Sequence, residues 1–159
     1  MIQVTVQVKG LDQTLKRWGK LPVEAQNASR ELLNSWGSEI TRLAKYKSPV
    51  DTGRLRSSIG YEVSISATSA YATAGPTVKY APPVEYGSRP HWPPSGALQP
   101  WARRHGFPMG ARGDWLLRSI IAKRGTKPHP FLAPASEEVE RTILPRLVDS
   151  FNNQIQELL

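Results

Sequence analysis

The chain has 159 residues, of which 21 are Lys or Arg and 13 are Asp or Glu, so its formal net charge is +8. A chain of this length predicts a single domain, and the absence of cysteine excludes disulfide scaffolds, thiolate zinc sites and cysteine nucleophiles. No apolar run reaches the roughly 20 residues that a membrane span needs, and the N-terminus does not have the pattern of a signal peptide. We therefore expect a soluble, unexported protein.

The first half of the chain switches between strand and helix patterns. Residues 1–8 carry apolar side chains at every second position and predict a strand with one buried face. A short helix is predicted over residues 11–18, followed by a long helix over residues 22–47 with apolar residues at three-to-four spacing. Residues 61–65 and 70–74 alternate again and predict a β-hairpin.

Two short segments flank the predicted hairpin. Residues 51–59 predict a capped turn that leads into the first hairpin strand, because Asp51 and Thr52 are capping residues and Gly53 permits unusual backbone geometry. Residues 80–87 predict a tight helical turn closed by a glycine, since the Pro-Pro pair inside it prevents a regular strand ladder.

Residues 88–126 form an irregular segment rich in proline, tryptophan and arginine, which we interpret as an insertion. Two short helices are expected within it, over residues 95–104 and 114–123, and Asp114 is in position to cap the second. The apolar stripe expected on the second helix consists of Trp115, Leu116, Ile120 and Ile121.

A last long helix is predicted over residues 134–158, with a bend at Pro145. The predicted fold class is therefore α+β, with a small, mainly antiparallel sheet formed by the N-terminal strand and the central hairpin. This sheet is expected to pack against the long N-terminal and C-terminal helices, in one domain over residues 1–159 that carries the inserted segment.

One string matches a catalytic signature. Asp51-Thr52-Gly53 has the form of the aspartic protease loop, whose two copies a homodimer could provide. Its context is wrong, because the nearby cations Lys47 and Arg54 would stabilise both ionised carboxylates and oppose the shared proton that the carboxylate pair needs. We predict that the protein is not an enzyme, with an Asp51-dependent protease as a remote alternative.

The histidines do not form a metal-binding pattern. His91, His105 and His129 are too far apart in sequence for a metal pair on one helix face, and prolines adjoin two of them. We therefore predict no metal site and no cofactor.

Basic charge is concentrated in the inserted segment. Between Trp101 and Phe131 there are seven Lys and Arg residues against one Asp, a local balance of +6, and tryptophans are interleaved with them. Three interpretations stay open: contact with a nucleic-acid backbone, a protein interface, or a small satellite core of tryptophans beside solvated cations. The candidate interface or DNA-facing residues are Trp92, Trp101, Arg103, Arg104, Arg112, Trp115, Arg118, Lys123, Arg124 and Lys127.

Three segments become informative when they are taken in order: residues 48–59 (SPVDTGRLRSSI), 80–87 (YAPPVEYG) and 127–135 (KPHPFLAPA). Together they resemble the tail-completion, or head-tail joining, proteins of long-tailed bacteriophages, the group that includes lambda-type minor tail protein Z. The positions that match the family pattern are Pro49, Asp51, Thr52, Gly53, Leu55, Ser58, Ile59, Tyr80, Ala81, Val84, Glu85, Gly87, Pro130, Phe131, Leu132, Pro134 and Ala135.

These motif residues are expected to specify the fold rather than a reaction. Leu55 and Ile59 should anchor their segment to the sheet, and Tyr80, Val84 and Tyr86 should pack. Glu85 is expected to pair with a nearby arginine, for which Arg54 and Arg56 are the candidates.

The resemblance implies a structural virion protein of the phage neck, assembled in the host cytoplasm. Copies would form a ring, with six copies as the first guess, between the head-completion proteins and the tail tube or its terminator. Contact with genomic DNA in the lumen is left open, and no membrane contact is implied. The alternative is a basic DNA-binding protein that contacts the nucleic-acid backbone.

Overall fold

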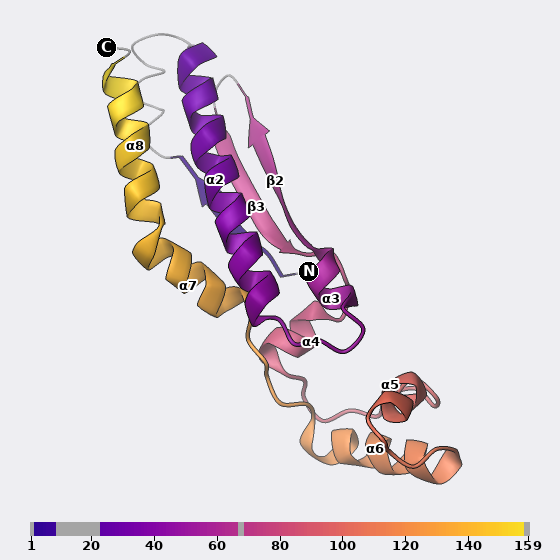
Figure 1. Cartoon of the computed structure of the whole chain (residues 1–159). Helices are drawn as coiled ribbons and strands as arrows, with labels where there is room; N and C mark the ends of the chain where they lie inside the picture. Colours follow the sequence, from indigo (N-terminus) through magenta and orange to yellow (C-terminus); the bar gives the residue numbers. More distant parts are fainter. Residues whose placement is uncertain (1, 9–22, 67–68, 158–159) are drawn as a thin grey trace. The chain divides into compact units, whose positions relative to one another are not determined.

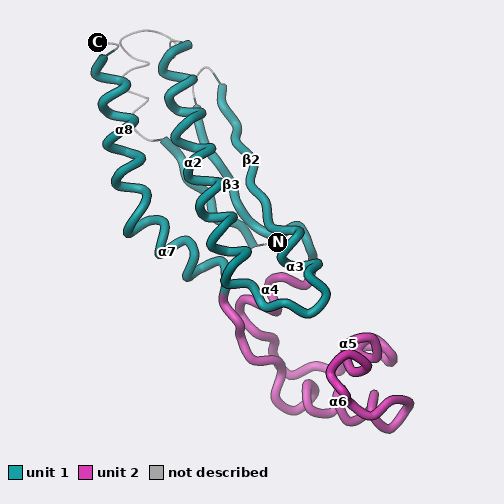
Figure 2. The backbone as a smooth tube through the Cα atoms, viewed as in Figure 1, with its two compact units in different colours: residues 1–79, 131–159 teal, residues 80–130 magenta. Residues whose placement is uncertain are grey.

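The computed structural model describes residues 2–8, 23–66 and 69–157, so the helix predicted over residues 11–18 lies outside the described part. The chain divides into two compact units (Figure 2). Unit 1 comprises residues 1–79 and 131–159, and unit 2 comprises residues 80–130. The prediction of one domain with an insertion over residues 88–126 stays a prediction. Among the described helices, none is both long and apolar enough to cross a bilayer.

Unit 1 is built on a three-stranded antiparallel sheet. The strands are β1 (Val4–Gln7), β2 (Ile59–Ile65) and β3 (Ala70–Pro76), in the spatial order β1-β3-β2. The central strand β3 pairs with both neighbours, and Ala74 lies opposite Val4 on one side and Tyr61 on the other. The predicted hairpin and N-terminal strand are therefore confirmed.

Helix α2 (Val23–Lys47) contacts both the sheet and the C-terminal helices (Figure 1). Small residues let it approach the sheet closely: Ala70, Ala72 and Ala74 of β3 are buried. A Cβ atom at Gly37 of α2 would overlap the ring of Tyr61 from β2, so glycine is needed at this crossing. The α+β class and the long N-terminal helix are thereby confirmed.

The C-terminal segment consists of two helices where one bent helix was predicted. Helix α7 (Leu132–Thr142) buries Leu132, Ala135 and Val139, and helix α8 (Leu144–Gln156) has no buried residue. The break falls just before Pro145, because proline has no N–H to donate and its ring clashes with the carbonyl one turn earlier. Pro145 thus occupies the first turn of a new helix rather than the middle of one.

The turn predicted over residues 51–59 contains a short helix, α3 (Arg54–Ser58). The N-cap residue is Gly53, which has a positive φ of 78° and makes no side-chain capping hydrogen bond. The backbone reversal at Gly53 leads directly into the helix, and the predicted capping of the turn by Asp51 and Thr52 stays a prediction. Leu55 and Ile59 are buried, as predicted.

Replacing Gly53 by valine should lower the free energy of unfolding by about 1–3 kcal/mol, since a β-branched residue is strained at positive φ. No atom lies within 4 Å of the position that the new Cβ would occupy, so the loss would come from the backbone alone. Gly60→Val is the matched control, because its Cβ position is equally open and valine favours strands. Urea denaturation of both variants checks this, and equal stability of the two would contradict it.

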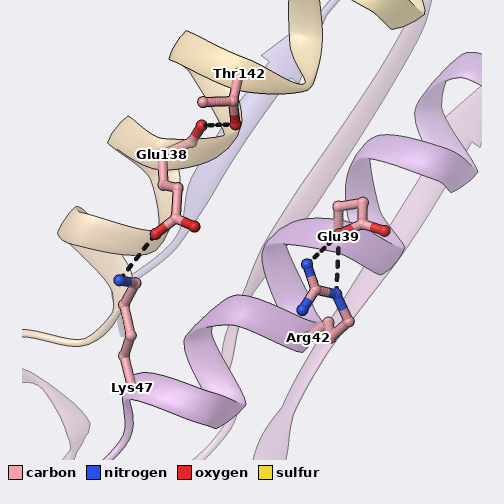
Figure 3. Close-up of polar contacts among 5 residues, drawn as sticks. All are labelled: Glu39, Arg42, Lys47, Glu138 and Thr142. Carbon is pink, nitrogen blue, oxygen red and sulfur yellow. Dashed lines mark hydrogen bonds and ion pairs between the residues drawn. The ribbon is translucent and has the colours of Figure 1, made fainter.

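An ion pair joins the end of α2 to α7 (Figure 3). Lys47 Nζ lies 2.9 Å from Glu138 Oε2, and Thr142 Oγ1 donates to the main-chain oxygen of Glu138 at 2.6 Å. The hydrogen bond from Lys47 lowers the pKa of Glu138 below its ordinary value of 4.5, and the positive charges of Lys47, Arg141 and Arg42 act in the same direction. The pair links two helices that are distant in sequence.

The lowered pKa of Glu138 gives a pH dependence of known sign. Because the carboxylate is favoured in the folded state, its contribution to stability is present above pH 4.5 and is lost as the pH falls through the lower, folded-state pKa. Glu138→Gln should therefore melt below the unmodified protein at neutral pH, and the two melting temperatures should converge in acid. Glu137→Gln, an exposed neighbour on the same helix, is the control. A gap between the melting temperatures of Glu138→Gln and the unmodified protein that persists unchanged in strong acid would contradict the assignment.

Candidate interaction surface

Unit 2 contains three helices: α4 (Ala81–Tyr86), α5 (Gln99–Arg104) and α6 (Ala111–Arg124). The predicted helical turn at residues 80–87 is confirmed as α4, and Gly87 ends it with a φ of 73°. Ala81 and Glu85 are buried, whereas Tyr80 and Tyr86 are 43% and 68% exposed. The predicted packing of these two tyrosines is therefore wrong, because the small alanine rather than the aromatic rings occupies the covered face.

A backbone bridge joins the two ends of residues 88–126. Ser88 and Thr126 exchange two main-chain hydrogen bonds, each of 3.2 Å, and Thr126 Oγ1 donates to Ser88 Oγ at 3.0 Å. A little further along, His129 N donates to the carbonyl of Val84 at 2.8 Å. The two ends of the segment between residues 88 and 126 therefore lie next to each other.

Asp114 organises the inside of this segment instead of capping a helix as predicted. Helix α6 begins three residues earlier, at Ala111, so Asp114 lies inside its first turn. Its carboxylate accepts a hydrogen bond from Gly96 N at 3.1 Å and one from Ser95 Oγ at 3.3 Å. Arg118, one turn later, places Nη1 3.5 Å from the same carboxylate. The buried acid thereby fixes α6 to the loop that precedes α5.

The side chain of Arg118 also contacts the loop that precedes α5. Its Nε donates to the carbonyl of Pro93 at 2.8 Å, and its guanidinium lies 5.5 Å from the centroid of the Trp92 ring. This cation therefore holds the loop onto α6. Of the candidate cations, Arg118 has an internal structural use.

Trp101 also makes contacts within unit 2. The ring of His105 stacks on it with centroids 4.1 Å apart, and Phe107 lies at 5.3 Å in a tilted arrangement. His105 Nδ1 lies 2.9 Å from the carbonyl of Trp101, and His91 Nδ1 lies 2.9 Å from the carbonyl of Arg89. In the described ranges, no three His, Cys, Asp or Glu side chains gather as a metal site would require.

Most of the apolar stripe predicted for α6 lies on the exposed side of the helix. The buried residues of this helix are Gly113, Asp114, Leu117 and Ser119. Trp115, Leu116 and Ile120 are instead 59%, 42% and 44% exposed. Three of the four residues of the predicted stripe are therefore exposed, and the buried side of α6 combines Leu117 with small and polar residues.

The tryptophans of unit 2 do not form a satellite core. Trp92 and Trp115 are more than half exposed, and Trp101 is 37% exposed. The remaining candidate cations lie on the surface of the same unit: Arg103, Arg104, Arg112, Lys123, Arg124 and Lys127. Exposed aromatic, aliphatic and cationic side chains thus occur together in unit 2. We define these exposed side chains as the candidate interaction surface.

The family-motif residues divide between core and surface. In the first segment Pro49, Asp51 and Thr52 are exposed, and Ser58 Oγ donates to the Leu55 carbonyl at 2.7 Å. In the last segment Phe131, Leu132 and Ala135 are buried, whereas Pro130 is exposed and Pro134 is partly exposed. Most of the apolar motif positions therefore serve the core, and the pairing predicted for Glu85 stays a prediction.

Sequence reasoning missed one feature of unit 1, a groove between α2 and α8. Leu32, Leu147 and Phe151 line it together with polar side chains, and Gln154 Nε2 donates to Glu31 Oε2 at 3.2 Å across it. The sequence signal for this groove is the four-residue spacing of apolar residues on α8, which places them on one face of the helix. In the structure no residue of α8 is fully buried, so this face is only partly covered.

Comparison with known proteins gives one match. Residues 12–87 match the model of a family described as "Bacteriophage HK97-gp10, putative tail-component". Neither a curated protein nor a solved structure matches the chain. The matched range covers just under half of the chain, ends at Gly87, and includes α2, α3, the hairpin and α4. Residues 12–87 of this chain are therefore similar to a family of bacteriophage tail components.

Proposed function

We propose that the protein is a structural component of a bacteriophage virion, located at the neck or tail, where it acts by shape and by association with other virion proteins. The observation that carries this proposal is the tail-component match over residues 12–87. Two of the three motif segments lie inside that range, and the third, at residues 127–135, follows in the expected order.

The finer assignment is tail completion, or head-tail joining, of the lambda minor tail protein Z type. In this role copies assemble as a ring, with six copies as the first guess, between head-completion proteins and the tail terminator or tail tube. A ring requires heterologous contacts between two different patches of one surface. The candidate interaction surface of unit 2 and the groove between α2 and α8 are two chemically different patches that support such contacts.

The proposal is tested in the phage or prophage that carries the gene. A nonsense mutation should yield filled heads and tails that do not join, and the intact gene supplied in trans should restore infectious particles. Electron microscopy of the mutant lysate tests the structural role in the virion, and electron microscopy of the purified protein tests whether it forms a ring. Normal particles in the mutant would refute the structural role, whereas joined particles built with a non-ring protein would refute only the ring.

The proposed role is non-enzymatic, and Asp51 provides its sharpest test. An aspartic protease loses its activity when its catalytic carboxylate becomes an amide, because the amide cannot exchange the shared proton. We expect Asp51→Asn to support a normal yield of infectious particles, since Asp51 is an exposed turn residue. A defect in particle maturation, in a variant that keeps the melting temperature of the unmodified protein, would favour the protease.

A direct DNA-binding role is the second candidate, and the charge of unit 2 favours it. Residues 80–130 contain eight Lys and Arg residues and two acidic residues, a net charge of +6. A backbone binder should hold duplex DNA at low salt and lose it steeply as salt rises, because binding releases counterions. A purified protein with little affinity for duplex DNA even at low salt would refute this second role.

A further inference from the structure

One helix of unit 2 presents an apolar stripe that the rest of the unit leaves open. Leu116 and Ile120 of α6 are spaced by four residues and therefore lie on one face, with Trp115 beside them. All three are more than 40% exposed although each is strongly apolar. Exposed apolar side chains that lie next to each other mark an interaction site more often than single ones do.

Cations border this stripe. Arg112 lies one turn before Leu116, and Lys123 lies one turn after Ile120, so both are placed at the ends of the same helix face. Both side chains are exposed. We call the set Arg112, Trp115, Leu116, Ile120 and Lys123 the α6 face.

The α6 face is held in place from behind. Asp114 and Arg118 project from the opposite side of α6 and bond to Gly96 and to the carbonyl of Pro93. A helix fixed in this way loses little conformational freedom when a partner binds its outer face. The α6 face is therefore preorganised.

The charge of unit 2 limits what its partner can be. Its two acids, Glu85 and Asp114, are both buried, and Asp114 is occupied by internal contacts. Seven cations other than Arg118 are exposed: Arg89, Arg103, Arg104, Arg112, Lys123, Arg124 and Lys127. The surface of the unit therefore presents positive charge almost alone, and a complementary partner is acidic.

The centre of the α6 face favours a protein over a nucleic acid. Leu116 and Ile120 offer neither a hydrogen bond to phosphate nor a ring on which a base stacks. Trp101 already stacks on His105, so the ring at this face that could stack on a base is that of Trp115, beside the apolar centre. An apolar centre with an aromatic residue and arginine at its margin is instead the composition of protein interfaces.

We infer that the α6 face docks an acidic protein surface, namely an apolar patch bordered by Asp and Glu on another protein. The face lies beyond Gly87, outside the range that matches the tail-component family, so this docking belongs to the inserted segment of this chain. Only the identity of the partner as another virion protein rests on the proposed function.

The inference is tested on the purified full-length chain with a labelled synthetic helix that has a leucine stripe bordered by glutamates. One control peptide replaces the glutamates by glutamine, and another replaces the leucines by serine. We expect the parent peptide to bind roughly tenfold more tightly than either control, because both charge and apolar contact contribute. Fluorescence anisotropy at physiological salt gives the three dissociation constants.

Two variants locate the binding. Leu116→Ser with Ile120→Ser should weaken binding of the parent peptide roughly tenfold or more, since it removes the apolar centre. Val23→Ser with Val148→Ser is the matched control, because both residues are exposed apolar residues of unit 1. Arg112→Glu with Lys123→Glu provides a second disruption that leaves the apolar side chains in place, in case the serine variant does not fold.

Three results would overturn the inference. The first is equal binding of all three peptides, and the second is equal binding by the variants of the α6 face and of unit 1. The third is duplex DNA that displaces the peptide and binds more tightly, which would identify the face as a nucleic-acid site. Because these assays use the purified chain, their failure is separate from the particle assay that tests the proposed function.

Discussion

Replacing Phe131 by alanine is expected to lower the free energy of unfolding by about 3–5 kcal/mol, the usual range for a fully buried phenylalanine. Phe131 is 0% exposed and lies immediately before α7, whose residues Leu132 and Ala135 are also buried. Truncation to alanine would remove most of a large side chain and leave a cavity that neighbouring groups fill only in part. Since domains are stable by only about 5–15 kcal/mol, a large part of the stability would be lost.

Urea denaturation followed by far-ultraviolet circular dichroism measures this loss. Phe131→Leu keeps much of the apolar volume and should lie between the alanine variant and the unmodified protein. Tyr46→Ala is the surface control, because Tyr46 is 80% exposed, and it should change stability by no more than about 0.5 kcal/mol. An alanine variant of Phe131 as stable as that control would mean that the motif residue does not belong to the core.

The strands of the sheet and helix α2 in unit 1 were predictable because their sequence patterns have a clear period. The alternation in residues 61–65 and 70–74 fits a half-buried hairpin, and the long stripe of α2 fits an amphipathic helix. Within that stripe Leu33 is fully buried, whereas its neighbour Leu32 is partly exposed. Periodicity identifies a face to within about one residue, and the packing of neighbouring elements decides the rest.

Unit 2 was predicted less well, for a physical reason. Sequence periodicity assigns the apolar side of a helix to the core, and on α6 this places Leu116 and Ile120 inside. The structure instead buries Leu117 together with Gly113 and Asp114. The carboxylate of Asp114 gains hydrogen bonds from Ser95 and Gly96, which are distant in sequence. The pattern did identify an apolar set of side chains on α6, but it could not show that three of them are exposed.

Long-range polar contacts were not predictable either. The ion pair between Lys47 and Glu138 and the bridge between Ser88 and Thr126 join residues that no local pattern connects. Each contact depends on which distant segments lie side by side, and this is determined only by the packing of the helices and strands. The role of the candidate cations as a group stays a prediction, and the internal contacts of Arg118 became visible only in the fold.

Replacing Gly125 by alanine should have the largest effect on unit 2. Gly125 ends α6 with a φ of 67°, and a Cβ atom there would overlap the main-chain oxygen of Ser88. The positive φ alone costs about 1–2 kcal/mol for a residue other than glycine. The overlap adds about 1–3 kcal/mol, because the obstructing atom belongs to the backbone and cannot rotate away. Separation of the two segments would break the paired hydrogen bonds between Ser88 and Thr126.

Gly106→Ala separates the two causes, because Gly106 has a similar φ of 69° but no atom within 4 Å of the position of its Cβ. This control should lose only the backbone part of the stability. Amide hydrogen exchange provides the local measurement, since the main-chain amides of Ser88 and Thr126 should lose protection in Gly125→Ala and keep it in Gly106→Ala. If both variants kept that protection, the close approach of Gly125 to Ser88 would not be needed to hold residues 88 and 126 together.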